Sequence, residues 1–376
     1  MSETLFIGML SGTSRDGVDA ALLRFVGNAP ELAAALCDPY PRPLAMALER
    51  VLRSGRRPPE TALQSLDAQI GEAFGDAALK LLEKAGVEAG SVSAIGSHGQ
   101  TVWHDPQGAP PESIQLGDPA RIARRTGIRT VADFRRADIE AGGQGAPLAP
   151  LLHQALFSPA SGTRAVLNLG GIANVSILRP GRAVEGFDTG PANCLLDAWI
   201  REQRGRPFDR DGEWSAGGRV DPDLLDTLLG DPWFSKAPPK STGIEYFNAA
   251  WLAPRLRRGT PRAPRDVQAT LAELTAVSTA AAVRACAAEE LLLCGGGTHN
   301  KDLVRRIRAR LPGVEVHATA TAGLDPDWVE AALFAWLARE RLAERRQDTR
   351  SITGAREPVL LGAVFDPQTS CIDIMK

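Results

Sequence analysis

Apolar residues gather in short runs that glycine-rich segments interrupt, and the first such pattern lies near the start of the chain. Residues 4–9 and 18–26 are apolar and rich in β-formers, and a segment rich in Ser, Gly and Asp separates them. Two apolar runs joined by a turn of this composition predict a β-hairpin. The pattern recurs in the middle of the chain, where residues 164–168 and 173–178 flank a pair of glycines. Each half of the chain is therefore predicted to contain a hairpin.

Longer stretches have the spacing of helices. From Leu63 the apolar residues recur at intervals of three and four until Gly86, which predicts an amphipathic helix that ends at this glycine. Residues 266–288 are apolar or small nearly all round, as in a buried helix, and Asp266 stands in the position of its N-cap. The pair Asp325-Pro326 is expected to open a last helix. Strands alternating with helices in both halves predict two α/β lobes of similar plan. Further strands are expected at residues 92–96, 127–133 and 291–294, and a further helix at 191–201.

Length and composition are those of a globular protein with more than one domain. The chain has 376 residues, which exceeds the size at which a single core usually stops growing. Hydrophobic residues make up 44% and charged residues 23%, close to ordinary globular usage. The formal net charge of −2 gives no reason to expect a nucleic acid as a partner.

The cysteines and the apolar runs bear on location. The five cysteines are widely separated and form no C-x-x-C pair, which is typical of reduced thiols in the cytoplasm. No long apolar segment precedes Met9, and no run approaches the roughly 18 apolar residues that would span a bilayer. We therefore expect a cytoplasmic protein without a membrane partner.

Three glycine-rich segments are candidates for binding phosphate. They cover residues 11–17, 168–174 and 294–298. Glycine lets backbone N–H groups approach a phosphate closely, and the carboxylates of Asp16 within the first segment and Asp19 just after it suit Mg²⁺. Hairpin turns explain the same residue types without any ligand. Neither a P-loop nor a complete G-x-G-x-x-G occurs, so any phosphate binding uses other loops.

Asp188 is open to two interpretations. It follows a predicted strand and precedes Pro191, which suits the first turn of a helix. Its carboxylate is then either the cap of that helix or a general base, which phosphoryl transfer needs in order to accept a proton from the nucleophile. The residue types alone leave both interpretations open.

Two polar segments are candidates for binding a sugar. His98 and Gln100 follow one predicted strand, and Asp133 and Arg135 follow another. Side chains of this kind hydrogen-bond sugar hydroxyls, but a satisfied loop histidine and a solvated charge cluster explain them comparably well. The spacing of the histidines does not match a zinc motif. Glu330 gains from the dipole of the last helix, which is a sufficient structural explanation for it.

Taken in order, these motifs resemble those of the anhydro-N-acetylmuramic acid kinase family. The resemblance runs from about residue 6 to residue 365, nearly the whole chain, and so many ordered matches are far more specific than any single loop. The segments that carry it are SGTSRDG (11–17), SHGQTVWH (97–104), QLGD (115–118), DFRR (133–136), GGQGAP (142–147), LGGIAN (169–174), DTGP (188–191), KSTG (240–243), QATL (268–271) and CGGG (294–297).

The resemblance implies an actin-like α/β fold of two ribonuclease-H-like lobes, with ATP and a sugar in the cleft between them. The lobes are expected at residues 1–140, completed by a segment from about residue 350, and at residues 141–350, with 142–147 as a candidate hinge. The implied reaction uses ATP, Mg²⁺ and water. It opens 1,6-anhydro-N-acetylmuramic acid and phosphorylates O6, giving N-acetylmuramate 6-phosphate and ADP in the recycling of cell-wall murein. The resemblance is also compatible with a homodimer.

The resemblance assigns roles to particular residues. Asp188 stands at the position of the catalytic aspartate, which takes a proton from the water that attacks the anomeric carbon. The first two glycine segments are expected to hold phosphates and the third to lie beside adenosine, while the Mg²⁺ ligands stay open. Arg15 and Ala192 depart from the family pattern without removing a chemical group. The implied nucleotide-binding residues are Gly12, Thr13, Ser14, Arg15, Asp16, Gly17, Val18, Asp19, Gly170, Gly171, Asn174, Gly295, Gly296 and Gly297, and the implied sugar-binding residues are His98, Gln100, Asp133, Arg135 and Glu330.

Two other functions remain open. One is an actin-like kinase of another sugar, in which Asp188 deprotonates a hydroxyl group. The other is a nucleotide-gated interaction protein that hydrolyses ATP slowly without any sugar. A screen of sugar acceptors, read by ADP release, separates the three hypotheses.

Overall fold

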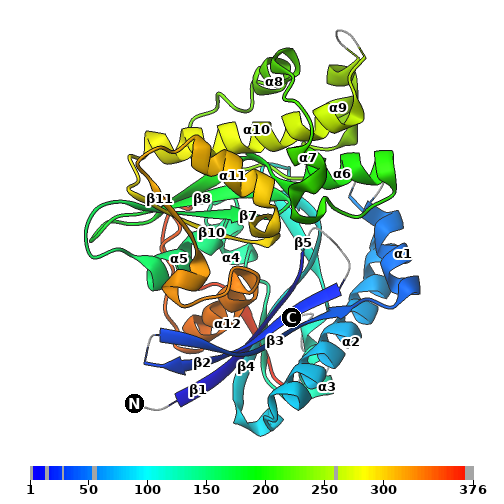
Figure 1. The fold of residues 1–376 in the computed structure, drawn as a ribbon. Coiled ribbons are helices and arrows are strands. Elements are labelled where there is room, and N and C mark those ends of the chain that lie inside the picture. Colours follow the sequence, from blue (N-terminus) through cyan, green and yellow to red (C-terminus); the bar gives the residue numbers. More distant parts are fainter. Residues whose placement is uncertain (1–2, 13–16, 28, 53–56, 258–260, 369–376) are drawn as a thin grey trace. The chain divides into compact units, whose positions relative to one another are not determined.

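The computed structural model describes residues 3–12, 17–27, 29–52, 57–257 and 261–368, which fall into two units (Figure 1). Unit 1 comprises Met1–Leu148 and Trp328–Lys376, and unit 2 comprises Ala149–Asp327. The last helix therefore belongs to unit 1, whereas the sequence placed it in the second lobe. The reason is that this helix packs against β1 and β4 of the first sheet.

The sheet of unit 1 has the strand order of a ribonuclease-H-like fold. Its first three strands form an antiparallel meander, and two further strands continue the sheet parallel to the first, in the order β12-β6-β4-β1-β2-β3. The predicted N-terminal hairpin is therefore confirmed. The strands are β1 (Glu3–Ser11), β2 (Gly17–Val26), β3 (Ala29–Pro39), β4 (Val92–Asp105), β5 (Glu112–Leu116), β6 (Thr130–Ala132) and β12 (Ala363–Phe365).

Unit 2 repeats this plan in its own sheet. The order β11-β10-β7-β8-β9 again combines an antiparallel meander with two strands parallel to the first one. The prediction of two ribonuclease-H-like lobes is thus confirmed, and the second hairpin lies where the apolar pattern placed it. The strands are β7 (Arg164–Leu169), β8 (Ile172–Leu178), β9 (Glu185–Pro191), β10 (Glu290–Cys294) and β11 (Glu315–Ala318).

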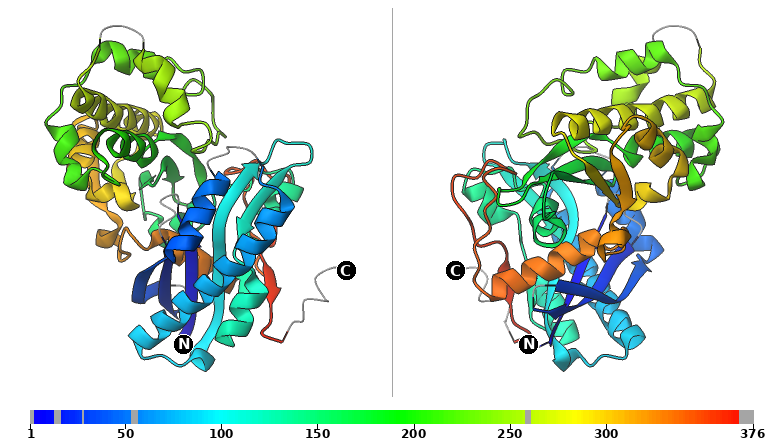
Figure 2. Two further views of the ribbon diagram at one scale, coloured as in Figure 1. Left: turned by 90° about the vertical axis from the view of Figure 1, so that its right-hand side faces the viewer. Right: turned by 60° about the vertical axis from the view of Figure 1, so that its left-hand side comes forward.

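Helix α12 (Val329–Leu342) lies directly on one face of the unit 1 sheet, as the right-hand view of Figure 2 shows. Gly8 and Gly96 are direct neighbours on β1 and β4. A Cβ atom at Gly8 would overlap the carbonyl group of Ala331, and one at Gly96 would overlap that of Phe334. These two glycines therefore make room for the close approach of the helix.

Helix α2 (Glu60–Ala85) covers the opposite face of the same sheet. Ile7 and Met9, which alternate with the glycine on β1, pack with Phe74 of this helix in the main core of unit 1. The helix ends at Gly86, whose φ of 64° is left-handed and which closes the helix with backbone hydrogen bonds, as predicted.

Two helices in the last third of the chain start at other residues than the sequence predicts. Helix α10 (Pro264–Ala285) begins before Asp266, whose carboxylate accepts the backbone N–H of Arg219 instead of capping the helix. Helix α12 begins after the pair Asp325-Pro326. The Pro326 carbonyl oxygen accepts the N–H of Gly295 instead, which holds this pair against the third glycine segment of unit 2.

The other helices surround these two sheets, and no helix in the described part of the chain combines the length and apolar character that a bilayer crossing needs. They are α1 (Arg42–Leu52), α3 (Pro119–Thr126), α4 (Arg136–Glu140), α5 (Ala149–Phe157), α6 (Asn193–Arg204), α7 (Glu213–Ala216), α8 (Pro222–Leu229), α9 (Ala249–Leu256) and α11 (Lys301–Ala309). Short 3₁₀ turns cover Ala89–Ser91, Arg210–Gly212, Gly296–His299 and Thr319–Ala322.

Candidate functional site

A row of polar side chains crosses the sheet of unit 2 beside its glycine turn. Asn168 on β7 pairs with Asn174 on β8, and Asn174 pairs in turn with Asp188 on β9. Direct cross-strand neighbours project from the same face of a sheet, so the three polar groups stand side by side. The side-chain oxygen of Asn174 is buried and has no hydrogen-bond partner among the residues that the structure describes. A buried polar row with an unsatisfied acceptor is typical of a ligand site.

Asp188 is part of a strand and does not cap a helix. Its backbone N–H donates to the carbonyl of Lys240 at 3.0 Å, and the N–H of Thr242 donates to its Oδ2 at 2.8 Å. The segment 240–242 thus runs along the outer edge of β9. Helix α6 begins five residues later without a side-chain cap, and Pro191 is the last residue of β9. The capping interpretation and the placement of Pro191 in a helix are therefore wrong.

Segment 240–242 is itself fixed to an aromatic cluster. The ammonium group of Lys240 lies 4.4 Å from the centre of the Trp233 ring and donates to the carbonyl of Phe234. The indole N–H of Trp233 donates to the carbonyl of Ser241. Burial lowers the pKa of Lys240, and the negative charge of Asp188 acts in the opposite direction. Trp233 and Phe234 therefore hold segment 240–242 at Lys240 and Ser241. Asp188 holds it at Lys240 and Thr242.

The turn between β7 and β8 presents backbone N–H groups away from helix α6. The carbonyls of Gly170 and Gly171 accept the backbone N–H groups of Asn193 and Ala192, each at 3.0 Å, and the Asn193 side chain donates to the Leu169 carbonyl at 2.9 Å. In a planar trans peptide the N–H of each residue points opposite to the C=O of the residue before it. The N–H groups of Gly170 and Gly171, which follow the Leu169 and Gly170 carbonyls, are therefore directed away from the helix, in the manner of an anion-binding turn.

The third glycine segment contains glycines of two kinds. A Cβ atom at Gly297 would lie 2.6 Å from the Cβ of Leu169, and one at Gly295 would overlap the side-chain oxygen of Asn168. These two glycines are explained by close packing against β7. A Cβ atom at Gly296 would meet nothing within 4 Å. Packing therefore does not explain the glycine at this position, and its contact with a nucleoside stays a prediction.

In unit 1, His98 and Arg135 contact each other. Two nitrogens of the Arg135 guanidinium, Nε and Nη2, lie 3.1 and 2.9 Å from Nε2 of His98, and Nη1 donates to the Gly145 carbonyl. An arginine only donates, so Nε2 accepts and the ring is neutral with its proton on Nδ1, facing the Gly99 carbonyl. Burial, and then the charge of Arg135, hold the pKa of His98 well below its usual value.

Glu330 lies on the same side of helix α12 as the residue that packs on His98. The rings of His98 and Phe334 stack with their centres 4.6 Å apart. Glu330 is exposed and precedes Phe334 by four residues, which places both on one face of the helix. The structure thus brings His98, Arg135 and Glu330 to one region of unit 1.

Asp133 and Gln100, the other two predicted sugar-binding residues, contact neither His98 nor Arg135 in the interactions recorded for them. Asp133 is left-handed, with φ 60°, and forms an ion pair with the exposed Arg136 at 2.7 Å. The interpretation as a solvated charge pair thus fits Asp133 but not Arg135. Gln100 is buried within β4, because this strand continues beyond its predicted end, and it accepts the hydroxyl of Ser11 at 2.8 Å. This bond gives Gln100 a structural role between β1 and β4.

The first glycine segment is described only in part. Residues 13–16, and with them Thr13, Ser14, Arg15 and Asp16, lie outside the described residues. Gly17 packs so closely on the Asp38 carbonyl that no side chain fits, and Val18 is buried in the core of unit 1. Both are explained by packing. Gly12 and Asp19 lie on either side of residues 13–16, and their contacts with a nucleotide stay predictions.

Three residues with structural or site roles were missed by the sequence interpretation. Asn168 belongs to the polar row, which only the strand register reveals. Thr242 lies in the KSTG motif, to which no role had been assigned. Asp138 is fully buried and accepts the Gly145 N–H and the hydroxyls of Thr349 and Thr353, so it fastens the loop that contacts Arg135. No local sequence signal distinguishes it from a surface acid.

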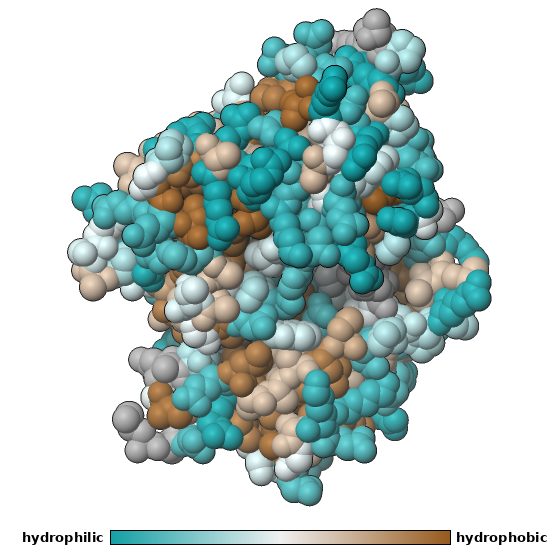
Figure 3. Space-filling model, viewed as in Figure 1, coloured by the Kyte–Doolittle hydropathy of each residue, from teal (hydrophilic) through white to brown (hydrophobic). Residues whose placement is uncertain are grey.

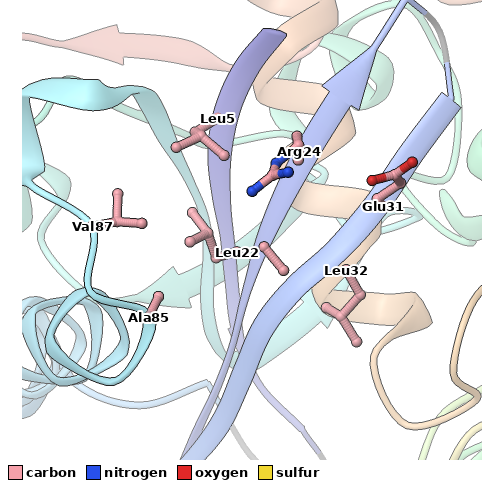
Figure 4. A pocket seen from close by; sticks show the side chains of 8 residues that line it. Leu5, Leu22, Arg24, Glu31, Leu32, Ala85 and Val87 are labelled. Atoms are coloured by element: carbon pink, nitrogen blue, oxygen red, sulfur yellow. The ribbon is translucent and has the colours of Figure 1, made fainter.

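A hollow at the edge of the unit 1 sheet contains none of these residues. Mostly apolar side chains line it, with Arg24 and Glu31 at its rim (Figure 4). These two are cross-strand neighbours of opposite charge on β2 and β3. Apolar side chains also gather on the visible surface of this unit (Figure 3). We do not assign the hollow to the site, because no candidate residue lines it.

Known proteins resemble this chain over nearly its whole length. The model of the family described as anhydro-N-acetylmuramic acid kinase matches residues 4–367. A protein of that name from Xanthomonas campestris pv. campestris strain 8004 is 50% identical over 96% of this chain and 97% of its own length. Its counterpart from Xanthomonas axonopodis pv. citri strain 306 is 49% identical over 97% of this chain and 99% of its own.

Solved structures align more distantly. A ROK family glucokinase from Streptomyces griseus, in complex with glucose and AMPPNP, covers 89% of this chain and 99% of its own at 16% identity and a TM-score of 0.42. The activator of the 2-hydroxyisocaproyl-CoA dehydratase from Clostridium difficile, with bound ADPNP, covers 92% of this chain and 99% of its own at 12% identity and a TM-score of 0.44.

Proposed function

The chain belongs to the anhydro-N-acetylmuramic acid kinase family, and we propose that it opens 1,6-anhydro-N-acetylmuramic acid with water and phosphorylates O6 from ATP, in the recycling of cell-wall murein. The observation that carries this proposal is the setting of Asp188. It is a buried carboxylate within a polar row, next to a turn that presents backbone N–H groups. A base beside a phosphate-binding turn is the arrangement that phosphoryl transfer requires.

The proposed reaction uses one carboxylate. Asp188 takes a proton from water, whose oxygen forms a bond to C1 of the sugar as the C1–O6 bond breaks. The O6 atom, which receives that electron pair, bonds to the γ-phosphorus, and the bond between this phosphorus and the β,γ-bridging oxygen breaks to release ADP. No second base is needed, because the leaving bridge oxygen already carries the developing charge. The N–H of Thr242 holds Oδ2 of Asp188 and thereby orients the carboxylate.

Nucleotide contacts are proposed for the glycine segments. The N–H groups of Gly170 and Gly171 suit phosphate oxygens, and the open side of Gly296 suits adenosine. Within the described residues no group of three or more His, Cys, Asp or Glu is placed to hold a metal ion. In kinases Mg²⁺ is held by one or two carboxylates together with the phosphates, whose charge it would neutralise here. Asp19, next to the first segment, has the chemistry for that role.

Sugar contacts are proposed for the group in unit 1. Arg135 and the exposed Glu330 offer a donor and an acceptor in one region, and His98, whose two ring nitrogens face Arg135 and the Gly99 carbonyl, positions the arginine. A direct contact of His98 with the sugar stays a prediction. Asp133 and Gln100 stay predictions as sugar contacts, since their recorded partners are Arg136 and Ser11. The homodimer and the interlobe cleft that the resemblance implies also stay predictions.

The experiment that tests the function measures ADP release with the anhydro sugar in water enriched in ¹⁸O. We expect release that depends on the anhydro sugar, with one labelled oxygen at C1 of the product. Release with reducing sugars and none with the anhydro sugar would favour a kinase of another sugar. An ATPase rate that no sugar changes would favour the nucleotide-gated protein.

Asp188→Asn tests the base. The amide keeps the shape but does not accept the proton, so we expect kcat to fall by about 10²- to 10⁴-fold with ATP binding retained. Asp226→Asn, on the exposed side of α8, is the matched control and should turn over normally. Near-normal activity of Asp188→Asn would remove this residue from the role of base.

A further inference from the structure

The Thr242 side chain lies beside the proposed base and has an unused hydroxyl. Its backbone N–H donates to Oδ2 of Asp188 at 2.8 Å. Its Oγ1 atom is buried, and no hydrogen-bond partner for it exists among the residues that the structure describes. A buried hydroxyl without a partner is costly, and such a group commonly marks a place where a ligand or water completes the site.

The position of Thr242 is fixed by its neighbours in the chain. The Lys240 carbonyl accepts the N–H of Asp188, and the Ser241 carbonyl accepts the indole N–H of Trp233. The Lys240 ammonium group packs on the same indole ring. Thr242 is therefore the end of a segment that β9 and the aromatic cluster hold in place. The unsatisfied hydroxyl is thus not the result of a loosely held loop.

We propose that the hydroxyl of Thr242 binds the water that attacks C1 of the sugar. Because the N–H and the hydroxyl belong to one residue, a water molecule can contact both Oγ1 of Thr242 and the carboxylate of Asp188. One hydrogen of this water passes to Asp188, and the other forms a hydrogen bond to Oγ1 and remains on the new C1 hydroxyl. A lone pair of the water oxygen is then left to form the bond to C1. This inference rests on the proposed function.

The test compares two substitutions that separate the hydroxyl from the shape of the side chain. Thr242→Val keeps the branched shape and the N–H to Asp188 but removes the hydroxyl, and Thr242→Ser keeps the hydroxyl but removes the methyl group. We expect kcat of Thr242→Val to fall by about 10- to 100-fold, the effect of losing one hydrogen bond to a reacting group. The KM values for ATP and for the sugar should stay within about threefold, and Thr242→Ser should keep most of the wild-type kcat.

A packing role predicts the opposite order, with Thr242→Ser more impaired than Thr242→Val. That order, or a kcat of Thr242→Val within twofold of wild type, would overturn the inference. Thr227→Val on α8 is the matched control, because its hydroxyl is already bonded to the carbonyl of Asp223. Should Thr242→Val not fold, Thr242→Ala removes the same hydroxyl and carries the same expectation relative to Thr242→Ser.

Failure of this inference is distinguishable from failure of the proposed function. An inactive Asp188→Asn together with a fully active Thr242→Val would overturn only the role of Thr242. A wild-type enzyme that releases no ADP with the anhydro sugar would overturn the function itself, and the inference with it.

Discussion

Acidification is expected to destabilise unit 2 through one buried histidine. His153 on α5 is completely buried, and its Nδ1 lies 2.7 Å from the hydroxyl oxygen of Ser176. Its Nε2 is buried without a partner in the described part of the chain. Burial lowers the pKa of His153 to about 3, because nothing compensates the imidazolium for the water that it would lose.

The magnitude follows from the two pKa values. The unfolded chain binds a proton at His153 near the ordinary value of 6.5, whereas the folded chain stays neutral down to about 3. Between these values the unfolded state holds one more proton, so the free energy of unfolding falls as the pH falls. Each pH unit by which the pH falls in this range lowers the free energy of unfolding by about 1.4 kcal/mol. Lowering the pH from 6.5 to 5 should therefore lower the free energy of unfolding by about 2 kcal/mol through His153 alone.

Urea unfolding of the full chain at pH 7 and pH 5 measures this loss. His153→Gln removes the titrating group and keeps a polar partner for Ser176, so the difference between the two pH values should shrink by about 2 kcal/mol relative to wild type. His317→Gln is the control, because the His317 side chain is 46% exposed. His98 and His104 also have lowered pKa values and act in the same direction in both proteins. An unchanged pH dependence in His153→Gln would refute the reasoning.

Two further predictions concern the glycine segment of β10 and the acid that fastens the unit 1 loop. Gly297→Ala should lower the free energy of unfolding by about 1–3 kcal/mol, because the added methyl group clashes with Leu169. Gly296→Ala should leave the free energy of unfolding unchanged and weaken ATP binding. Urea unfolding measures the stability and titration calorimetry the ATP affinity, and equal losses of stability in the two variants would contradict the distinction. Asp138→Asn should lower the free energy of unfolding by about 1.5–3 kcal/mol, because the amide nitrogen would face a hydrogen-bond donor. Asp348→Asn is the control and should lower it little, because the Asp348 side chain is 41% exposed. Equal urea midpoints for the two variants would speak against a role for Asp138.

The elements that the sequence predicts well are those with local causes. Both hairpins follow from apolar runs on either side of a turn, and helix α2 ends at Gly86 because a left-handed residue closes it. The strand order of each unit follows from the alternation of elements together with the family resemblance. Helix starts were less predictable, since Asp325-Pro326 has the composition of a helix start but is used in a contact with Gly295.

Local sequence patterns do not predict the environment of Asp188. Its neighbours Gly190 and Pro191 suggest a helix start, yet a segment about fifty residues further along the chain pairs with the edge of β9 and keeps Asp188 in the strand. Hydrogen bonds between distant segments leave no periodic signal in either one. The same holds for Asn168, which joins the polar row only through the registers of two strand pairs.

The glycines show why counting a residue type is a weak guide to a site. Gly295 and Gly297 leave no room for a side chain, so the fold requires them whether or not a nucleotide binds. At Gly296 a side chain would meet nothing within 4 Å, and at Gly170 nothing closer than 3.5 Å, so the protein's own packing does not require glycine there. Substitution of Gly170 or Gly296 should therefore test the proposed nucleotide contacts without a loss of stability.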